Sequence, residues 1–426
     1  MKITELLGYQ VLDSRGKPTV AAAITLEDGT THTARVPSGA STGKHEAFEL
    51  RDGTTTQADR YFGGNSVNKA VENINTEIAQ HLIGEPIDLQ LVDQKLEQLD
   101  PSTNHSQLGA NATLAVSLAT AIAAAHAKGL SLARYFQPAG KLLLPMPMVN
   151  ILSGGAHANR TLDFQDVLIV PNGANSFSEA ISWVVAIREA AARLGSEQGK
   201  ITNLVADEGG LGIPFLSIQD ACNFVLSAIE EVGLSVGAQV SLALDVASTQ
   251  FFKGERYQLN NLGREFTSSE FVQFILGLVT EFPIISIEDP FAEDDWGAWR
   301  SFTGLAPSGL QILGDDLLTT SSTRLDKAIT TKAANAILIK ANQNGLVTST
   351  LEVLLRAQSA GFKTIVSARS GETEDSWLAD LATGWRSGQI KVGSTHGAER
   401  NAKWNRLLEL EWREETEFAK PFKSAT

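Results

Sequence analysis

The sequence predicts an α/β fold in which a closed barrel of alternating strands and helices follows a smaller α+β domain. Its 426 residues exceed what one hydrophobic core usually organises. Beyond about residue 138, short runs rich in Val, Ile and Leu alternate with helix-length segments, a pattern typical of parallel βα units. About eight such runs within fewer than 300 residues favour a closed barrel over an open sheet.

The first domain, residues 1–137, is predicted to contain strands followed by helices. The stretch "PTVAAAITLEDGTTHTARV" has strand composition on both sides of Asp28-Gly29, which is a hairpin signal. Helices are expected at about 66–83 and 110–127. The second contains "TLAVSLATAIAAAHA", which is too short and too polar to span a membrane, so we expect a buried helix that ends near Gly129.

The second domain, residues 138–426, begins in "FQPAGKLLLPMPMVN", whose three prolines and one glycine predict a linker. One helix of this domain is clear at 217–232, where apolar residues such as Ile218, Ala221 and Val225 recur at helical spacing. The predicted strands are, in order, "DVLIV", "NLVAD", "VSLALD", "IISIED", "QILGDD", "AILIK", "KTIVSAR" and "QIKVG".

The composition limits the partners and the compartment. The formal net charge is −14 and the pI is ≈ 5.0, which argues against nucleic acid or an anionic membrane as a partner. Cys222 is the only cysteine, so an intrachain disulfide and a cysteine-based zinc site are excluded. The first residues, "MKITELLGYQ", lack the features of a signal peptide. We therefore expect a cytoplasmic protein without a membrane partner.

Charged residues end most of the predicted strands. The carboxyl ends of barrel strands converge on one face, and that face carries the chemistry. Three of these carboxylates, Asp245, Glu288 and Asp315, would repel one another strongly unless a cation lay among them. Oxygen-only ligands suit Mg²⁺ or Mn²⁺. The alternative is a network of salt bridges that these carboxylates form with Lys340, Lys391 and Arg369.

Two lysines, Lys340 and Lys391, end neighbouring strands beside the expected cation. Positive surroundings lower the pKa of a lysine, so that a larger fraction is neutral and able to accept a proton. Lys340 could thus remove the weakly acidic proton next to a carboxylate. A structural ion pair remains the alternative for either lysine.

Several polar loop residues suit a phosphate group. Arg369 and Ser370, in "SARSGETEDS", combine a guanidinium fork with a hydroxyl. The stretch "SGASTGKHE" looks like a phosphate-binding loop, but its glycines enclose three residues and His45 follows Lys44, so it is not the P-loop of nucleotide-binding proteins. His157, in "SGGAHANR", could reach the site from a glycine-rich loop.

Taken together, the motifs resemble those of the enolase family. The matching stretches are "DSRGKPTV", "VPSGASTGKHEAFELRDG", "NILSGGAHA", "ADEGGLG", "LALDVAS", "SIEDPFAEDDW", "GDDLLTT", "ILIKANQNG", "RSGETED" and "GQIKVG", in the order and spacing of the family, over residues 13–405. The resemblance implies an α+β cap domain before a ββαα(βα)₆ barrel. It also implies 2-phosphoglycerate as the substrate, two Mg²⁺ sites of which the second depends on substrate, and usually a homodimer.

The resemblance also implies a role for each matching residue. Asp245, Glu288 and Asp315 match the ligands of the first Mg²⁺, and the last two also border the substrate. The other matches are Ser41 for the second, phosphate-bridged Mg²⁺, Lys340 for the base at C2, Glu208 for the acid at the C3 hydroxyl, Lys391 for the substrate carboxylate, Arg369 and Ser370 for the phosphate, and His157 for a second closing loop. The stretch "SGASTGKHE" then becomes a lid that closes over the phosphate.

Two positions in the active site depart from the family. Ala368 replaces the histidine that contacts the phosphate, and Asp166 replaces the glutamate that works with Glu208. The first reading is dehydration of 2-phospho-D-glycerate to phosphoenolpyruvate. The altered positions suggest an alternative, dehydration of 2-phosphonoformylglycerate to carboxyphosphonoenolpyruvate, with the extra carboxylate in the space beside Arg369. A catalytically impaired binding protein is a second alternative. Arg369 and Ser370 speak against an unphosphorylated acid as the substrate.

Overall fold

The computed structural model describes residues 1–40, 43–54 and 60–422 of the chain. The amino-terminal part forms an antiparallel sheet with the strand order β1-β2-β3. These strands are β1 (Ile3–Leu12), β2 (Pro18–Leu26) and β3 (Thr31–Arg35). Gly29 has a φ of 82° in the turn between β2 and β3, a conformation that glycine adopts without strain. The predicted hairpin at Asp28-Gly29 is therefore confirmed.

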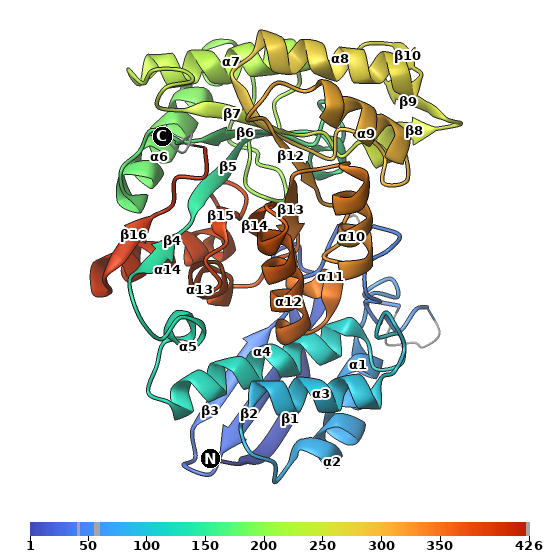
Figure 1. Cartoon of the computed structure of the whole chain (residues 1–426), viewed down its shortest axis with the longest axis vertical. Coiled ribbons are helices and arrows are strands. Elements are labelled where there is room, and N and C mark those ends of the chain that lie inside the picture. Colours follow the sequence, from blue (N-terminus) through green and yellow to red (C-terminus); the bar gives the residue numbers. More distant parts are fainter. Residues whose placement is uncertain (41–42, 55–59, 423–426) are drawn as a thin grey trace.

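Helices cover one face of this sheet (Figure 1). The helices in contact with the sheet are α1 (Asn68–Asn73), the π turn η1 (Ile74–Ile78), α2 (Ala79–Leu82) and α4 (Ala110–Ala127), whereas α3 (Leu89–Leu99) and α5 (Leu132–Phe136) pack on α4. The apolar helix α4 is long enough to cross a membrane by composition, but 83% of it is buried inside the protein, where it packs on β2 and β3. It is a core helix, as the sequence predicted.

The second part is a closed barrel with the strand order β11-β12-β13-β14-β15-β5-β6-β7. Strand β6 runs antiparallel to both of its neighbours, whereas the other neighbouring strands are parallel. The predicted ββαα(βα)₆ arrangement is thus confirmed. The strands are β5 (Met146–Ser153), β6 (Asp166–Val170), β7 (Ser241–Asp245), β11 (Ile284–Glu288), β12 (Gln311–Gly314), β13 (Ala336–Ile339), β14 (Lys363–Ser367) and β15 (Gly388–Lys391).

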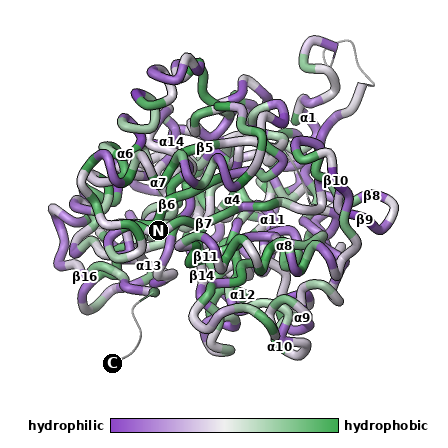
Figure 2. Tube along the Cα trace, turned by 90° about the horizontal axis from the view of Figure 1, so that it is seen from above, coloured by the Kyte–Doolittle hydropathy of each residue, from purple (hydrophilic) through white to green (hydrophobic). Residues whose placement is uncertain are grey.

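Eight longer helices accompany the barrel, and hydrophobic residues gather between them and the strands (Figure 2). They are α6 (Phe177–Glu197), α7 (Ile218–Glu231), α8 (Ser268–Glu281), α9 (Trp296–Leu305), α10 (Ser322–Thr331), α12 (Val347–Ser359), α13 (Trp377–Gly384) and α14 (Ala398–Arg413). The short elements are β4 (Leu142–Leu144), η2 (Gly155–Ala158), η3 (Ser248–Phe251), β8 (Phe252–Lys253), β9 (Arg256–Leu259), β10 (Arg264–Phe266), α11 (Ala341–Asn344) and β16 (Thr416–Phe418).

Among the barrel strands, one prediction is wrong and one strand was missed. The run "NLVAD" forms only an isolated bridge between Val205 and Leu211, and it lies in a loop. The missing barrel strand is β5, which the prolines of the expected linker concealed. Pro147 lies within β5 opposite Ile390 of β15, so a proline occupies a barrel strand at the point where the barrel closes.

Inside the barrel, apolar side chains form a core of their own. Phe418 and Phe422, close to the carboxyl end, pack against this core. Strand β16, which carries Phe418, pairs with β4 immediately before the barrel begins. Residues 416–422 therefore pack against the barrel without joining its closed sheet.

Asp93 of α3 joins the amino-terminal domain to the barrel. Its carboxylate accepts hydrogen bonds from the backbone N–H (3.0 Å) and the hydroxyl (2.8 Å) of Thr348, in the first turn of α12. This contact satisfies a donor that the helix itself leaves free. Burial raises the pKa of Asp93 to about 6, although Ser117 and Thr348 lower it.

We expect Asp93→Asn to stabilise the protein at neutral pH. The amide still accepts from Thr348, and the charge that is costly to bury is gone. A pKa near 6 in the folded state, against about 4 when unfolded, corresponds to a stabilisation of about 3 kcal/mol above pH 6. The carboxyl holds its proton more tightly in the folded state than in the unfolded state. The free energy of unfolding of the variant should therefore exceed that of the unaltered protein by more at pH 6.5 than at pH 4.5. Thermal unfolding at both pH values measures it, and an equal shift at both would contradict this origin.

Candidate active site

The reversed direction of β6 brings its first residue to the mouth of the barrel. Asp166 begins β6, and it pairs in register with Asp245, which ends β7. Asp245 in turn pairs with Glu288 at the end of β11. Ser153 at the end of β5 also lies opposite Asp166. Strand ends that are far apart in sequence thus place their carboxylates at one face.

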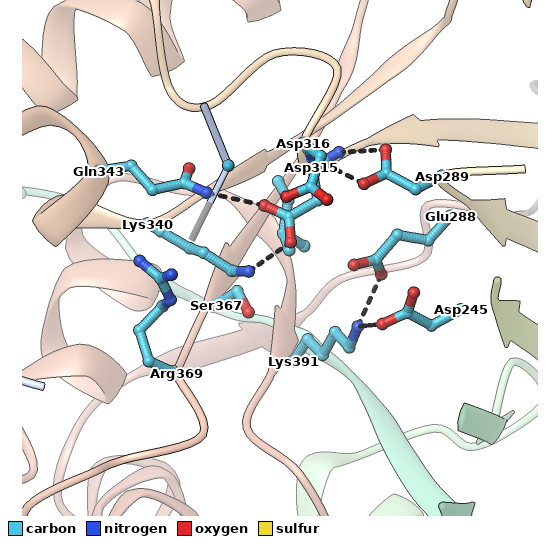
Figure 3. A network of polar contacts seen from close by, with 12 residues as sticks. Asp245, Glu288, Asp289, Asp315, Asp316, Lys340, Gln343, Ser367, Arg369 and Lys391 are labelled. Atoms are coloured by element: carbon cyan, nitrogen blue, oxygen red, sulfur yellow. Dashed lines mark hydrogen bonds and ion pairs between the residues drawn. The ribbon is translucent and has the colours of Figure 1, made fainter. Parts of the chain in front are cut away.

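Lys391 lies between two of the predicted metal ligands (Figure 3). Its Nζ is 2.7 Å from Oδ2 of Asp245 and 2.8 Å from Oε2 of Glu288, and all three side chains are buried. Burial lowers the pKa of Lys391, but the two carboxylates outweigh it and hold that pKa well above its usual value. Burial and the neighbouring Asp245 raise the pKa of Glu288 well above normal.

The proposed base, Lys340, forms an ion pair with Asp315 (Figure 3). Gln343 donates to the other oxygen of Asp315 at 2.9 Å. Burial lowers the pKa of Lys340, but Asp315 outweighs it and the net shift is upward. In this arrangement the nearest partner of the amine is a carboxylate, whereas the lowered pKa was expected beside a bound cation and stays a prediction.

The expected trio Asp245, Glu288 and Asp315 does not form the tightest group of carboxylates. Lys391 holds the first two and Lys340 holds the third. Instead, possible ligand atoms of Asp289, Asp315 and Asp316 lie within 4.8 Å of one another. The second acids of "ED" and "DD" were visible in the sequence, but Asp289 and Asp316 were not among the predicted ligands.

Asp289 organises this group through the backbone. Its carboxylate accepts the N–H groups of Asp315 at 2.9 Å and of Asp316 at 2.7 Å. Burial and the neighbouring Asp315 raise the pKa of Asp316 to about 7. Crowded, buried oxygen ligands of this kind fit Mg²⁺, which prefers oxygen donors and relieves the repulsion between carboxylates.

A second group consists of His157, Asp166 and Glu208, whose possible ligand atoms also lie within 4.8 Å of one another. Nδ1 of His157 lies 3.7 Å from Oδ2 of Asp166, and Ser153 donates to Asp166 at 2.6 Å. Burial opposes a charge on His157, but Glu208 and Asp166 raise its pKa to about 9. Burial raises the pKa of Glu208, whereas His157 and Arg400 lower it further, to about 2. The proton of this group therefore lies on the imidazole.

Glu208 reaches the site from a loop, not from the end of a strand as predicted. The loop is held at the barrel mouth by Leu211, which donates to the carbonyl of Ile151 at 2.9 Å and accepts from Ser153 at 3.0 Å. Asn150 of β5 donates to the Glu208 carboxylate at 3.1 Å. Neither Asn150 nor Ser153 was predicted from the sequence.

The predicted phosphate residues contact the lid. Arg369 pairs with Glu46 at 3.0 Å and donates to Asn342 at 2.8 Å, while the Ser370 hydroxyl accepts from the Ala40 N–H at 2.7 Å. The backbones of Ser38 and Gly371 form an antiparallel bridge beside them. Ser41, the expected contact to the second Mg²⁺, lies outside the described residues. Glu46 belongs to the lid stretch, but its contact with Arg369 was not predicted from the sequence.

These groups border a single cavity of ≈ 30 Å³ at the barrel mouth. Both proton-transfer candidates, Lys340 and Glu208, line it, and so does Ala368. Ala368 is 6% exposed, which places the altered position against the site. The remaining lining residues are His157, Gln165, Asp245, Asp315, Asp316, Ser367, Arg369, Ser370 and Lys391.

Fold and site together define an α/β-barrel enzyme whose acids and amines meet at the carboxyl ends of the strands. Two family models match the sequence. The model described as "Enolase, N-terminal domain" matches residues 3–136, and the model described as "Enolase, C-terminal TIM barrel domain" matches residues 141–421. The chain belongs to the enolase family, and its class of activity is that of an enolase-superfamily lyase.

We expect the affinity for Mg²⁺ to rise about tenfold between pH 6 and pH 8. Asp316 has a pKa near 7 without the ion, and a cation that requires ionised carboxylates must displace its proton. Protons therefore compete with Mg²⁺ at the lower pH. Calorimetric titration in two buffers of different ionisation enthalpy measures both the affinity and the proton release.

The control is Asp316→Asn, which removes this proton. Its affinity for Mg²⁺ should be weaker and should depend less on pH around neutrality. An unchanged pH dependence in this variant would assign the proton to another group.

Proposed function

We propose that this protein eliminates water from 2-phospho-D-glycerate to give phosphoenolpyruvate, with Lys340 as the base that removes the C2 proton. The observation that carries the proposal is that Lys340 and Glu208 line the same buried cavity. Such an elimination needs a base at C2 and a proton donor at C3, and the cavity provides both. Arg369 and Ser370 line it as well and suit the phosphate.

The residues present fit Mg²⁺ as the cofactor. Asp315 would be one ligand. The family resemblance assigns Asp245 and Glu288 beside it, and Asp289 and Asp316 are the acids whose oxygens lie nearest to Asp315. When bound, Mg²⁺ supplies positive charge that stabilises the negative charge developing on the substrate carboxylate. Lys391, whose raised pKa keeps its amine charged, would orient that carboxylate.

Lys340 must be neutral to accept a proton, whereas its contact with Asp315 keeps it charged. The basic form therefore requires another positive partner to take the place of Lys340 beside Asp315. On the other side, the group of His157, Asp166 and Glu208 holds one proton on the imidazole. Glu208 is the member of this group that the family resemblance assigns to the leaving hydroxyl, and we propose that the proton reaches the hydroxyl through it.

A second candidate reaction is favoured by Ala368 and Asp166. Alanine at 368 leaves no imidazole beside Arg369, and Asp166 is one methylene shorter than glutamate. Ser153 donates to Asp166 at 2.6 Å, so the shorter carboxylate is held rather than loose. Dehydration of 2-phosphonoformylglycerate to carboxyphosphonoenolpyruvate would place an additional carboxylate near Arg369.

We expect the protein to exchange the C2 proton of its substrate with solvent deuterium, and Lys340→Met to exchange it at least about 100-fold more slowly, because a positioned base contributes 10²–10⁴-fold. Mass spectrometry of each candidate substrate in deuterium oxide with Mg²⁺ measures the exchange. Absence of exchange on both compounds with the unaltered protein would support a binding protein and sink the proposal.

We expect Ala368→His to separate the two reactions. A hydrogen bond to a charged group contributes about 1.5–3 kcal/mol, so kcat/KM on 2-phosphoglycerate should rise by roughly tenfold or more. The same imidazole should obstruct the larger phosphonate and lower its turnover. Both compounds are assayed with both proteins. If the unaltered protein turns over only the phosphonate, that reaction replaces the first proposal.

A further inference from the structure

We propose that Gln343 is a positioning residue that links the lid to the ion pair of the base. It belongs to α11, the short helix that directly follows Lys340 and β13. Its side chain is almost fully buried, at 3% exposure, so its polar atoms must find partners inside the protein. The inference deepens the proposed function, because it concerns how the same site is assembled.

Gln343 determines how Asp315 uses its two oxygens. The amide nitrogen donates to Oδ1 at 2.9 Å, and Oδ2 faces the amine of Lys340 (Figure 3). With Oδ1 held, rotation of the carboxylate would break a buried hydrogen bond. Asp315 is therefore fixed in orientation both toward Lys340 and toward a cation that would replace it.

Thr320 determines which end of the amide faces Asp315. Its hydroxyl donates to Oε1 of Gln343 at 2.8 Å and accepts the backbone N–H of Lys340 at 2.9 Å. The ionised Asp315 carboxylate can only accept, so the amide NH₂ faces it, and Oε1 takes the Thr320 hydroxyl proton at a shorter distance than the Leu338 carbonyl at 3.4 Å. Thr320 is fully buried, which leaves water no part in this choice.

The other side of Gln343 contacts the lid. Its backbone carbonyl accepts the N–H of Ala47 at 2.9 Å, and its amide nitrogen lies 3.4 Å from Oε1 of Glu46. Glu46 in turn holds Arg369 at 3.0 and 3.2 Å. Gln343 therefore contacts both Asp315, which pairs with the base, and Glu46, which pairs with the phosphate-binding arginine. Through Gln343, docking of the lid and the orientation of the Asp315 carboxylate stabilise each other.

The alternative is that Gln343 only fills space in the core. Gln389 offers a matched control, because it is a buried glutamine inside the same barrel, hydrogen-bonded to Gln311 at 2.8 Å. Leucine has a similar volume to glutamine but no donor. A purely structural role predicts similar consequences for Gln343→Leu and Gln389→Leu.

The test measures Mg²⁺ binding to the full chain by calorimetry, without substrate. We expect Gln343→Leu to weaken binding at least about tenfold, as residues that orient a metal ligand usually do, and Gln389→Leu to lower Tm without changing the affinity. Thr320→Val, which keeps the shape and removes the hydroxyl, should weaken binding by a smaller factor. It decides the matter if Gln343→Leu does not fold.

Several outcomes would overturn the inference. These are an unchanged affinity in Gln343→Leu, or in Thr320→Val where Gln343→Leu does not fold, an equal loss in Gln389→Leu, or no Mg²⁺ binding by the unaltered protein. Failure of the C2 exchange with intact Mg²⁺ binding would instead sink the proposed reaction and leave the role of Gln343 standing.

Discussion

The site depends on keeping several carboxylates ionised or shared within a space that excludes most water. In such surroundings an unpaired charge is strongly disfavoured, and removing one partner of a buried pair destabilises far more than removing a surface pair. The chain meets this constraint with buried amines, since Lys391 serves Asp245 and Glu288 while Lys340 serves Asp315. The two lysines that the proposed reaction needs are thus also the groups that offset the free-energy cost of burying these carboxylates.

Much of this arrangement was predictable because the fold converts sequence position into location. A charged residue after an apolar run becomes a residue at the barrel mouth, which is how Asp245, Glu288, Asp315, Lys340 and Lys391 were found. Periodicity also identified α7, and composition identified α4. Strand β5 escaped because Pro145 and Pro147 are read as breakers, although the barrel accommodates the second of them within a strand.

The remaining misses involve contacts between segments that sequence spacing does not relate. Glu46 meets Arg369 across 323 residues, and Gln343 meets Asp315 across 28. Glu208 lies in a loop that Leu211 holds against β5. The apolar run before it has the composition of a strand, so a strand was wrongly predicted there. Sequence spacing left the partner of Lys340 open between a cation and a carboxylate, and the packing brings its amine against Asp315. Side-chain pairing, unlike topology, is decided by the three-dimensional packing.

The closure of the barrel by β5 and β15 has a consequence for synthesis on the ribosome. One edge of β5 stays unpaired until β15 is synthesised, more than two hundred residues later, and Ile390 then lies opposite Pro147. Until then the emerging polypeptide exposes an unpaired apolar edge, which favours association with other nascent chains. A product that terminates before β15 would lack the strand that closes the barrel against β5 and would keep this edge exposed.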